Sequence, residues 1–198
     1  MTAAPTRATG RDALLAWAIG HFAEHGVGDT SLRALAEAIG TSHRMLIYHF
    51  GSRDGLLAAV VDTVEQGARD TLTRMVEEAT SDPDPTEAGL RFWHLVTEDA
   101  LVYGPLFFEL SSHAMLDLPH TTGLRERLVM TWLDALEAMW HGRGVPRARA
   151  RQQGRLDLAV ARGLLHDLLL TGEREQVDAA MRRYAEDTVR RMLEPGQS

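Results

Sequence analysis

Apolar residues recur every three or four positions along almost the whole chain, and no stretch alternates convincingly between apolar and polar residues. This spacing is typical of amphipathic helices, whereas a half-buried strand requires a period of two. Residues 53–79 show it most clearly, because they contain no proline and place Leu57, Val60, Val64 and Leu72 at helical spacing. Most of the 7 prolines and 17 glycines fall between such segments, so we predict an all-α fold with short connections.

Residues that start and stop helices divide the chain further. Hydroxyl side chains at Thr9, Ser31, Ser42 and Ser52 can each cap a helix. We expect helices at about 9–25, 31–40, 42–49, 53–79, 87–100, 105–116, 122–142, 146–171 and 173–193. Thr86 is the expected cap of the fifth, which should end at a break before Gly104–Pro105.

The charge is distributed unevenly. The formal net charge of −7 comes entirely from residues 57–198, since residues 1–56 hold five arginines and five acidic residues. Residues 38–53 contain basic and histidine side chains but no acid, so DNA, if bound, is expected there.

The chain has no cysteine, which excludes disulfides, thiolate metal sites and cysteine nucleophiles. Apolar runs such as Leu56 to Val61 are too short to span a membrane and no secretory signal is evident, so we expect a cytoplasmic protein.

The three short N-terminal helices have the pattern of a helix-turn-helix. Ala36 is small where two helices must cross, and Gly40 can adopt the turn conformation that other residues resist. Leu32, Leu35 and Leu46 are expected to hold the second and third helices against the first. The third helix would then present outward a set of side chains suited to a major groove, namely His43, Arg44, Met45, Ile47 and Tyr48.

These residues resemble the TetR family of bacterial regulators. The resemblance rests on the segments Phe22–Gly26, Thr30–Leu32 and Leu35–Gly40, and continues through Leu46, His49–Phe50, Ser52–Arg53 and Leu56–Leu57. It implies a helix-turn-helix DNA-binding domain at residues 1–56. A long helix would join it to a helical ligand-binding and dimerisation domain at residues 57–198.

The resemblance also implies which residues contact DNA. They are Thr30, Arg33, Ser42, His43, Arg44, Met45, Ile47, Tyr48, His49 and Arg53. Arg33 falls where some members read guanine, and Arg53 replaces a customary lysine at a backbone-contacting position. Ile47 stands where a tyrosine often contacts phosphate, and Arg44 stands where glycine or proline is usual, so the operator cannot be inferred from relatives.

A region rich in aromatic residues follows, and the resemblance implies that it encloses an effector. The candidate pocket residues are Phe92, Trp93, His94, Tyr103, Phe107, Phe108, Glu109, His113, Trp132 and Met139. This composition suits an apolar or aromatic ligand, although the same residues can equally be core. The pairs His94/Glu98 and Glu109/His113 can be polar handles, solvated or internally bonded pairs, or metal ligands; we favour no metal, for these or for His21/His25.

The last two helices are the expected dimer interface. Residues 156–171 are apolar around most of their circumference, which predicts burial against both the core and a second chain. The candidate interface residues are Gly163, Leu164, Leu168, Met181 and Tyr184.

Together these features predict a homodimeric regulator of double-stranded DNA. We expect a repressor that binds a palindromic operator and is released by an unidentified small apolar or aromatic effector. No phosphate loop or catalytic triad is evident, so we expect neither enzymatic activity nor a cofactor. The alternative is a helical binding or scaffold protein whose N-terminal head has lost specific DNA recognition.

Overall fold

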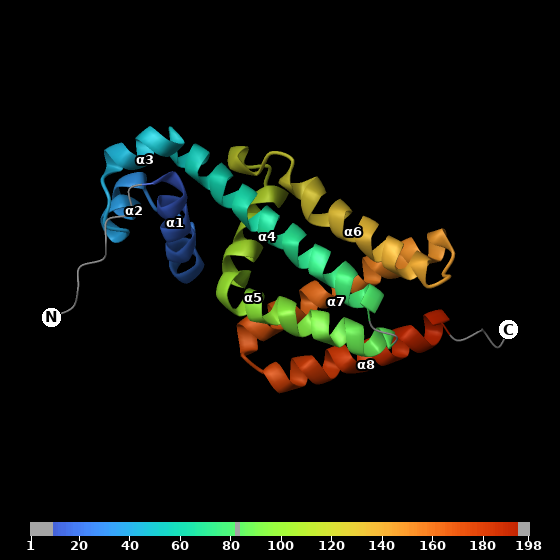
Figure 1. Cartoon of the computed structure of the whole chain (residues 1–198). Helices are drawn as coiled ribbons and strands as arrows, with labels where there is room; N and C mark the ends of the chain where they lie inside the picture. Colours follow the sequence, from blue (N-terminus) through green and yellow to red (C-terminus); the bar gives the residue numbers. More distant parts are fainter. Residues whose placement is uncertain (1–9, 82–83, 194–198) are drawn as a thin grey trace. The chain divides into compact units, whose positions relative to one another are not determined.

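The computed structural model describes residues 10–81 and 84–193, and all regular structure within them is helical. Figure 1 shows the helices in chain order. They are α1 (Arg11–His25), α2 (Leu32–Ala38), α3 (His43–Phe50), α4 (Arg53–Ser81), α5 (Pro85–Met115), the short 3₁₀ helix η1 (Pro119–Thr121), α6 (Leu124–Gly142), α7 (Arg147–Thr171) and α8 (Arg174–Leu193). The predicted all-α fold is confirmed. Within these residues, no helix has the length and apolar character needed to cross a membrane.

The helix starts follow the predicted capping residues. In three places a serine Oγ accepts a hydrogen bond from the backbone N–H three residues later, at 3.0–3.2 Å. These serines are Ser31, Ser42 and Ser52. Each bond satisfies a donor that the first helical turn leaves unpaired. The predicted cap at Thr9 lies outside the described residues, and the N-cap position of α1 is Gly10, which has no side chain to donate or accept.

The predicted start of α5 was wrong by two residues. The helix begins at Pro85, and the cap is Asp84 rather than Thr86. Its Oδ1 accepts hydrogen bonds from the backbone N–H of Thr86 at 2.8 Å and of Glu87 at 3.3 Å. A carboxylate is the stronger acceptor, and it also complements the positive end of the helix dipole.

The predicted break at Gly104–Pro105 was also wrong, because α5 continues through Pro105. Proline removes one helical hydrogen bond, but Leu106 and Leu110 just beyond it are only 0% and 2% exposed. Burial of these side chains offsets the local cost. The preceding glycine allows close packing, since a Cβ at Gly104 would lie 2.7 Å from Cδ1 of Leu169 and that side chain would have to shift.

The chain divides into two units by packing. One comprises the residues up to Gln66 together with 105–125, and the other comprises 67–104 together with 126–198. The second half of α5 and η1 thus group with the three N-terminal helices. The domain boundary expected after residue 56, between a DNA-binding domain and a ligand-binding and dimerisation domain, remains a prediction.

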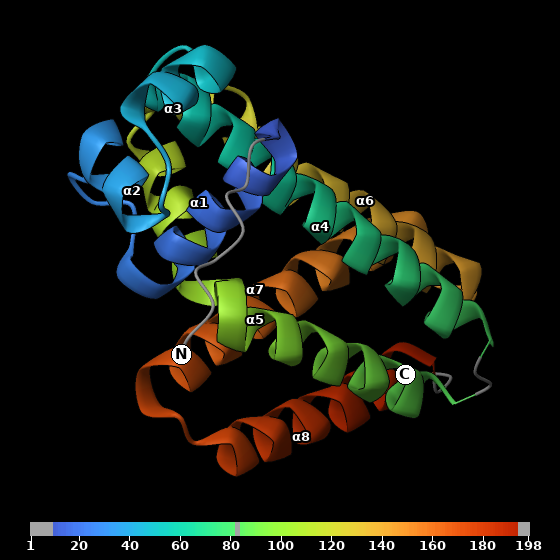
Figure 2. The ribbon, with the colours of Figure 1, turned by 60° about the vertical axis from the view of Figure 1, so that its left-hand side comes forward.

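In the first unit, α2 packs against both α1 and α3, as Figure 2 shows. The five helices α1 to α5 all contribute fully buried leucines to the core of this unit. They are Leu14 of α1, Leu35 of α2, Leu46 of α3, Leu56 and Leu57 of α4, and Leu106 of α5. The apolar face of α3 is therefore fixed, and its opposite face is left to solvent.

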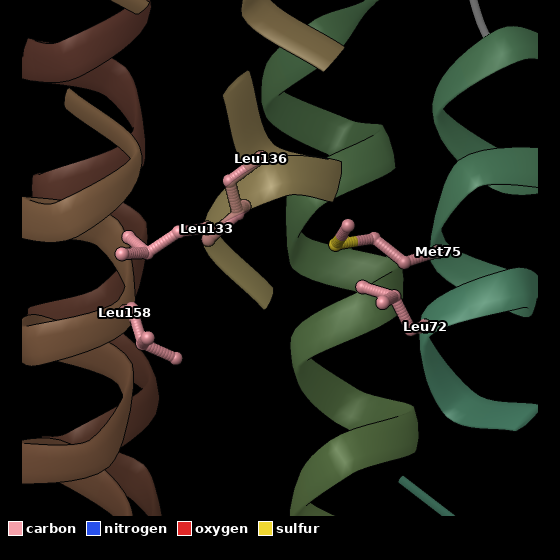
Figure 3. Close-up of a cluster of buried hydrophobic side chains, with 5 residues drawn as sticks. All are labelled: Leu72, Met75, Leu133, Leu136 and Leu158. Atoms are coloured by element: carbon pink, nitrogen blue, oxygen red, sulfur yellow. The ribbon is translucent and has the colours of Figure 1, made fainter. Parts of the chain in front are cut away.

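In the second unit, a leucine-rich cluster joins three helices (Figure 3). Leu72 and Met75 of α4 face Leu133 and Leu136 of α6, with Leu158 of α7 beside them. Around the cluster pack the partly buried Phe92, Val129, Met130, Trp132, Ala135 and Met139. In the same unit, α7 packs against α8. The first half of α5 runs along α8, to which it is tied by the ion pairs Glu87–Arg182 at 2.9 Å and Glu98–Arg174 at 3.2 Å.

Candidate nucleic-acid interface

A tight turn joins α2 to α3. The backbone N–H of Thr41 donates to the carbonyl of Ala36 at 2.8 Å, and that of Gly40 donates to Glu37 at 3.2 Å. Together these bonds form a Schellman motif, whose left-handed position is Gly40 with a φ of 70°. Ala36 is 2% exposed, as expected of a small residue at a helix crossing. The predicted helix-turn-helix geometry is present.

One face of α3 points to solvent. Leu46 and Phe50 are buried, whereas Tyr48 is 78% exposed and Ile47 is 39% exposed. Of the residues predicted to contact DNA, the exposed ones are Arg33, Ser42, His43, Arg44, Ile47 and Tyr48, and the half-buried ones are Thr30, Met45, His49 and Arg53. Six of the ten residues predicted to contact DNA are thus exposed, and four of these six belong to α3.

The electrostatic character of this surface differs from that of the whole chain. The net charge is −7, yet residues 38–53 include no acidic residue. The negatively charged DNA backbone repels an acidic protein surface. Arginines on the protein increase its affinity for DNA, because they displace the counterions of the phosphates. The exposed face of α3 therefore meets an elementary requirement for DNA approach.

His49 is placed differently from its exposed neighbours. Its Nε2 atom is buried and has no hydrogen-bond partner. The imidazole centroid lies 4.9 Å from the ring of Tyr48 and 6.3 Å from that of Phe50. A phosphate can reach His49 through Nε2 only if the ring turns.

Arg53 points at the protein backbone. Its Nε donates to the carbonyl of Thr30 at 2.9 Å, and its Nη2 donates to the carbonyl of Gly28 at 2.5 Å. A longer contact of 3.5 Å joins Nη2 to the carbonyl of Val27. In the structure this arginine holds the loop before α2, and its predicted contact with a phosphate stays a prediction.

Glu109 and His113, two of the predicted pocket residues, belong to the first unit and have protein partners there. The Glu109 carboxylate accepts hydrogen bonds from the backbone N–H groups of Val27 at 2.7 Å and Gly28 at 2.9 Å. The Nδ1 of His113 lies 3.1 Å from the Nε2 of His120. Of the alternatives considered for this pair, the structure shows internal hydrogen bonding.

The other predicted pocket residues lie in separate groups. In the second unit, Phe92 and Trp132 have ring centroids 6.2 Å apart, and Met139 packs on the same leucine-rich cluster. In the first unit, the rings of Phe107 and Phe108 meet edge to face at 5.4 Å. Tyr103 is 47% exposed. Among the predicted pocket residues the structure thus shows two aromatic pairs, Phe92 with Trp132 and Phe107 with Phe108.

Trp93 and His94 point toward α8. Trp93 is buried, and its Nε1–H donates to Oδ1 of Asp178 at 2.7 Å. His94 Nε2 lies 3.9 Å from Oδ2 of the same carboxylate. Burial raises the pKa of Asp178, but hydrogen bonds from Trp93 and Arg174 outweigh it and hold the pKa below its ordinary value. These residues form a structural link between α5 and α8.

Among the residues that the structure describes, no three or more histidine, aspartate and glutamate side chains are grouped so that they could hold an ion. The rings of His21 and His25 stack with centroids 4.5 Å apart, and the Nδ1 of His25 is 3.0 Å from the carbonyl oxygen of His21.

The predicted dimer residues on α7 and α8 differ in exposure. Leu168 and Met181 are 2% and 8% exposed within the single chain, so they serve the packing of this chain and cannot face a partner. Tyr184 donates a hydrogen bond to Asp157 at 2.8 Å, and burial raises the pKa of its hydroxyl. Leu164 is half-buried and Gly163 is exposed. The exposed large apolar side chains of α7 are Leu156 at 52% and Leu170 at 72%.

Sequence comparison points in the same direction as this geometry. Residues 14–60 match the model of a family described as bacterial regulatory proteins, tetR family. Over 187 residues the chain is 31% identical to the HTH-type transcriptional regulatory protein RaaS of Mycobacterium tuberculosis. The aligned region covers 89% of this chain and 80% of that protein.

Solved structures share the fold over nearly the full length. A transcriptional regulator from Rhodococcus sp. Rha1 superposes with a TM-score of 0.79 at 21% identity, covering 95% of this chain and 100% of that one. A TetR transcriptional regulator from Legionella pneumophila superposes with a TM-score of 0.72 at 17% identity, covering 92% and 97%. At these identities the likeness shows the fold alone.

Proposed function

The chain belongs to the TetR family of bacterial regulatory proteins, and on that premise we propose that it is a repressor which binds a palindromic operator as a homodimer and leaves it when a small molecule binds. It is a transcriptional regulator with a DNA-binding helix-turn-helix. The observation that carries the proposal is the exposed, acid-free face of α3 in an otherwise acidic chain. In this proposal the protein has no catalytic role. It acts in the cytoplasm, where its DNA lies.

The residues of this face have distinct roles in the proposal. Arg44 and Arg33 read guanine edges, because the guanidinium fork matches the two acceptors that guanine presents in the major groove. Ile47 contacts a thymine methyl group. Tyr48 and Ser42 hold phosphates through their hydroxyl groups, which positions α3 without reading sequence.

A dimer suits the proposed palindromic operator. Two recognition helices related by a two-fold axis meet successive major-groove faces when they lie about 34–36 Å apart. The exposed apolar residues Leu156 and Leu170 on α7, with Gly163 between them, supply a surface that a second copy can cover.

The effector is an apolar or aromatic small molecule. Phe92, Trp132 and Met139 in the second unit offer it aromatic and thioether contacts. Release from DNA requires that the effector bind the DNA-free state more tightly than the bound state. Titration of a hit compound, followed by tryptophan fluorescence with and without operator, measures that difference; equal affinities would contradict effector control.

The proposal of specific DNA binding is tested by selection. The purified protein should enrich one palindromic sequence from a library of random duplexes, with affinity that falls as salt rises. Tyr48→Ala should weaken binding to every duplex, and Arg155→Ala, at an exposed position of α7, is the matched surface control. Enrichment of no sequence would favour the alternative, a helical binding protein without specific DNA recognition.

A further inference from the structure

The loop that leads into α2, residues 26–30, is held from two sides by charged side chains. On one side the Glu109 carboxylate accepts the backbone N–H groups of Val27 and Gly28 at 2.7 and 2.9 Å. On the other side Arg53 donates to the carbonyls of Gly28 and Thr30 at 2.5 and 2.9 Å. Such charge-assisted bonds are stronger than bonds between neutral groups, so donors and acceptors of the loop are both firmly engaged.

The backbone of the loop leaves little freedom around this arrangement. Val27 is 0% exposed, and its side chain therefore anchors the loop in the core of the first unit. A Cβ at Gly26, where φ is 76°, would lie 3.2 Å from Oε2 of Glu109. The Glu109 carboxylate thus lies directly against the backbone at residue 26, where the space suits a glycine.

Two histidines join the two sides. His113 Nε2 lies 3.9 Å from Oε1 of Glu109, and His113 Nδ1 lies 3.1 Å from Nε2 of His120. On its other side His120 Nδ1 is 4.0 Å from Oδ1 of Asp54, the residue next to Arg53. The second half of α5, η1 and the start of α4 therefore meet around the loop through a continuous series of polar side chains.

We propose that Glu109 is a positioning residue for DNA recognition: it fixes the loop from which α2 starts and so sets the orientation of α2 and α3 without touching DNA. The loop ends two residues before Leu32, and the Schellman turn joins α3 rigidly to α2. A shift of the loop therefore moves the reading face. Misplacing contacts by about 1 Å is enough to lose much of a directional interaction. The inference rests on the proposed role of the α3 face.

The first test reads the loop directly, without DNA. In Glu109→Gln one acceptor oxygen becomes an amide N–H₂, so at least one of the Val27 and Gly28 amides loses its partner. We expect native-state hydrogen exchange of that amide to accelerate about tenfold. Glu109→Ala should accelerate both. Glu98→Gln is the control, since it changes the same charge on the same helix and Glu98 is an exposed partner of Arg174. Unchanged exchange at Val27 and Gly28 in both Glu109 variants would overturn the proposal.

The second test measures specificity. Glu109→Gln should lower affinity for the selected operator about tenfold relative to random duplex, with an unchanged salt slope, because no phosphate contact is removed. A variant that is only less stable would lose both affinities in the same proportion, which a thermal melt would reveal. If exchange accelerates while the ratio of operator to random affinity stays at the wild-type value, Glu109 holds the loop but does not position the reading face. Failure of the wild type to prefer any sequence would instead refute the proposed function and, with it, this role.

Discussion

The Nδ1 of His113 and the Nε2 of His120 lie 3.1 Å apart, although the two residues belong to different helices. A nitrogen–nitrogen hydrogen bond forms only when one ring donates and the other accepts, so both rings cannot be fully protonated while it persists. His120 is buried, and its surroundings include the positive charge of Arg53 and the negative charge of Asp54. The contact is therefore sensitive to acid.

Stability should fall as pH drops below about 6.5. Burial, then the charge of His113 and that of Arg53, lower the pKa of His120 below 6.5, and Asp54 opposes them only in part. The folded chain then binds fewer protons at His120 than the unfolded chain does. Stability is complete above the unfolded pKa and is lost as pH falls through it toward the folded pKa. Urea unfolding between about pH 5 and pH 8 measures this slope.

The variant His120→Asn should flatten that pH dependence. His43→Asn, an exposed histidine on α3, should leave it at the wild-type slope and serves as the control. If His120→Asn kept the full slope, the acid sensitivity would have to come from other groups.

Arg53→Lys separates two roles of this side chain. Lysine keeps the charge that a phosphate contact needs, but it lacks the planar fork that reaches the carbonyls of Gly28 and Thr30. We expect Arg53→Lys to cost about 1–2 kcal/mol in the free energy of unfolding and to weaken operator binding. Thermal melts and fluorescence anisotropy measure both, with Arg155→Lys as an exposed control. Wild-type stability together with nearly wild-type DNA affinity would favour the predicted phosphate contact as the main role of this side chain.

Arg44→Ala should change sequence preference. An arginine that reads a guanine contributes about 1–3 kcal/mol of discrimination at its base pair. The side chain is exposed at the start of α3, so its loss should leave the fold and its melting temperature unchanged. Repeating the selection with the variant should show relaxed preference at one position of each half-site. A uniform loss across all sequences would assign Arg44 to phosphate.

Much of the fold could be predicted because its signals are local. A serine before an apolar helical repeat caps the helix wherever the helix packs, and Gly40 provides a turn conformation that most other residues resist. Pro105 misled the prediction for the opposite reason. Its local cost is outweighed by burial of Leu106 and Leu110, which no window around the proline reveals.

In the candidate site, too, the features with local signals could be predicted and those that depend on long-range contacts could not. The outward face of α3 follows from helical periodicity, which places Leu46 and Phe50 inside and Tyr48 outside. The bonds from Val27 and Gly28 to Glu109 span 82 and 81 positions in sequence. Nothing in the local pattern selects one carboxylate among the 28 acidic residues, and the family resemblance instead implies a pocket position for Glu109. Only the tertiary structure shows its partners.

Dimer contacts can be separated from core contacts on α7. Leu170 is 72% exposed in the single chain, so Leu170→Arg places no unpaired charge in the core, and the monomer should keep its fold. The same charge would be buried in a dimer that covers this surface, where an unpaired charge costs several kcal/mol. Sedimentation should therefore show a folded monomer for Leu170→Arg and, by the same argument, for Leu156→Arg. Leu168→Arg should unfold the chain instead, since Leu168 is only 2% exposed. Intact dimers of wild-type affinity in both exposed-site variants would place the interface on another surface.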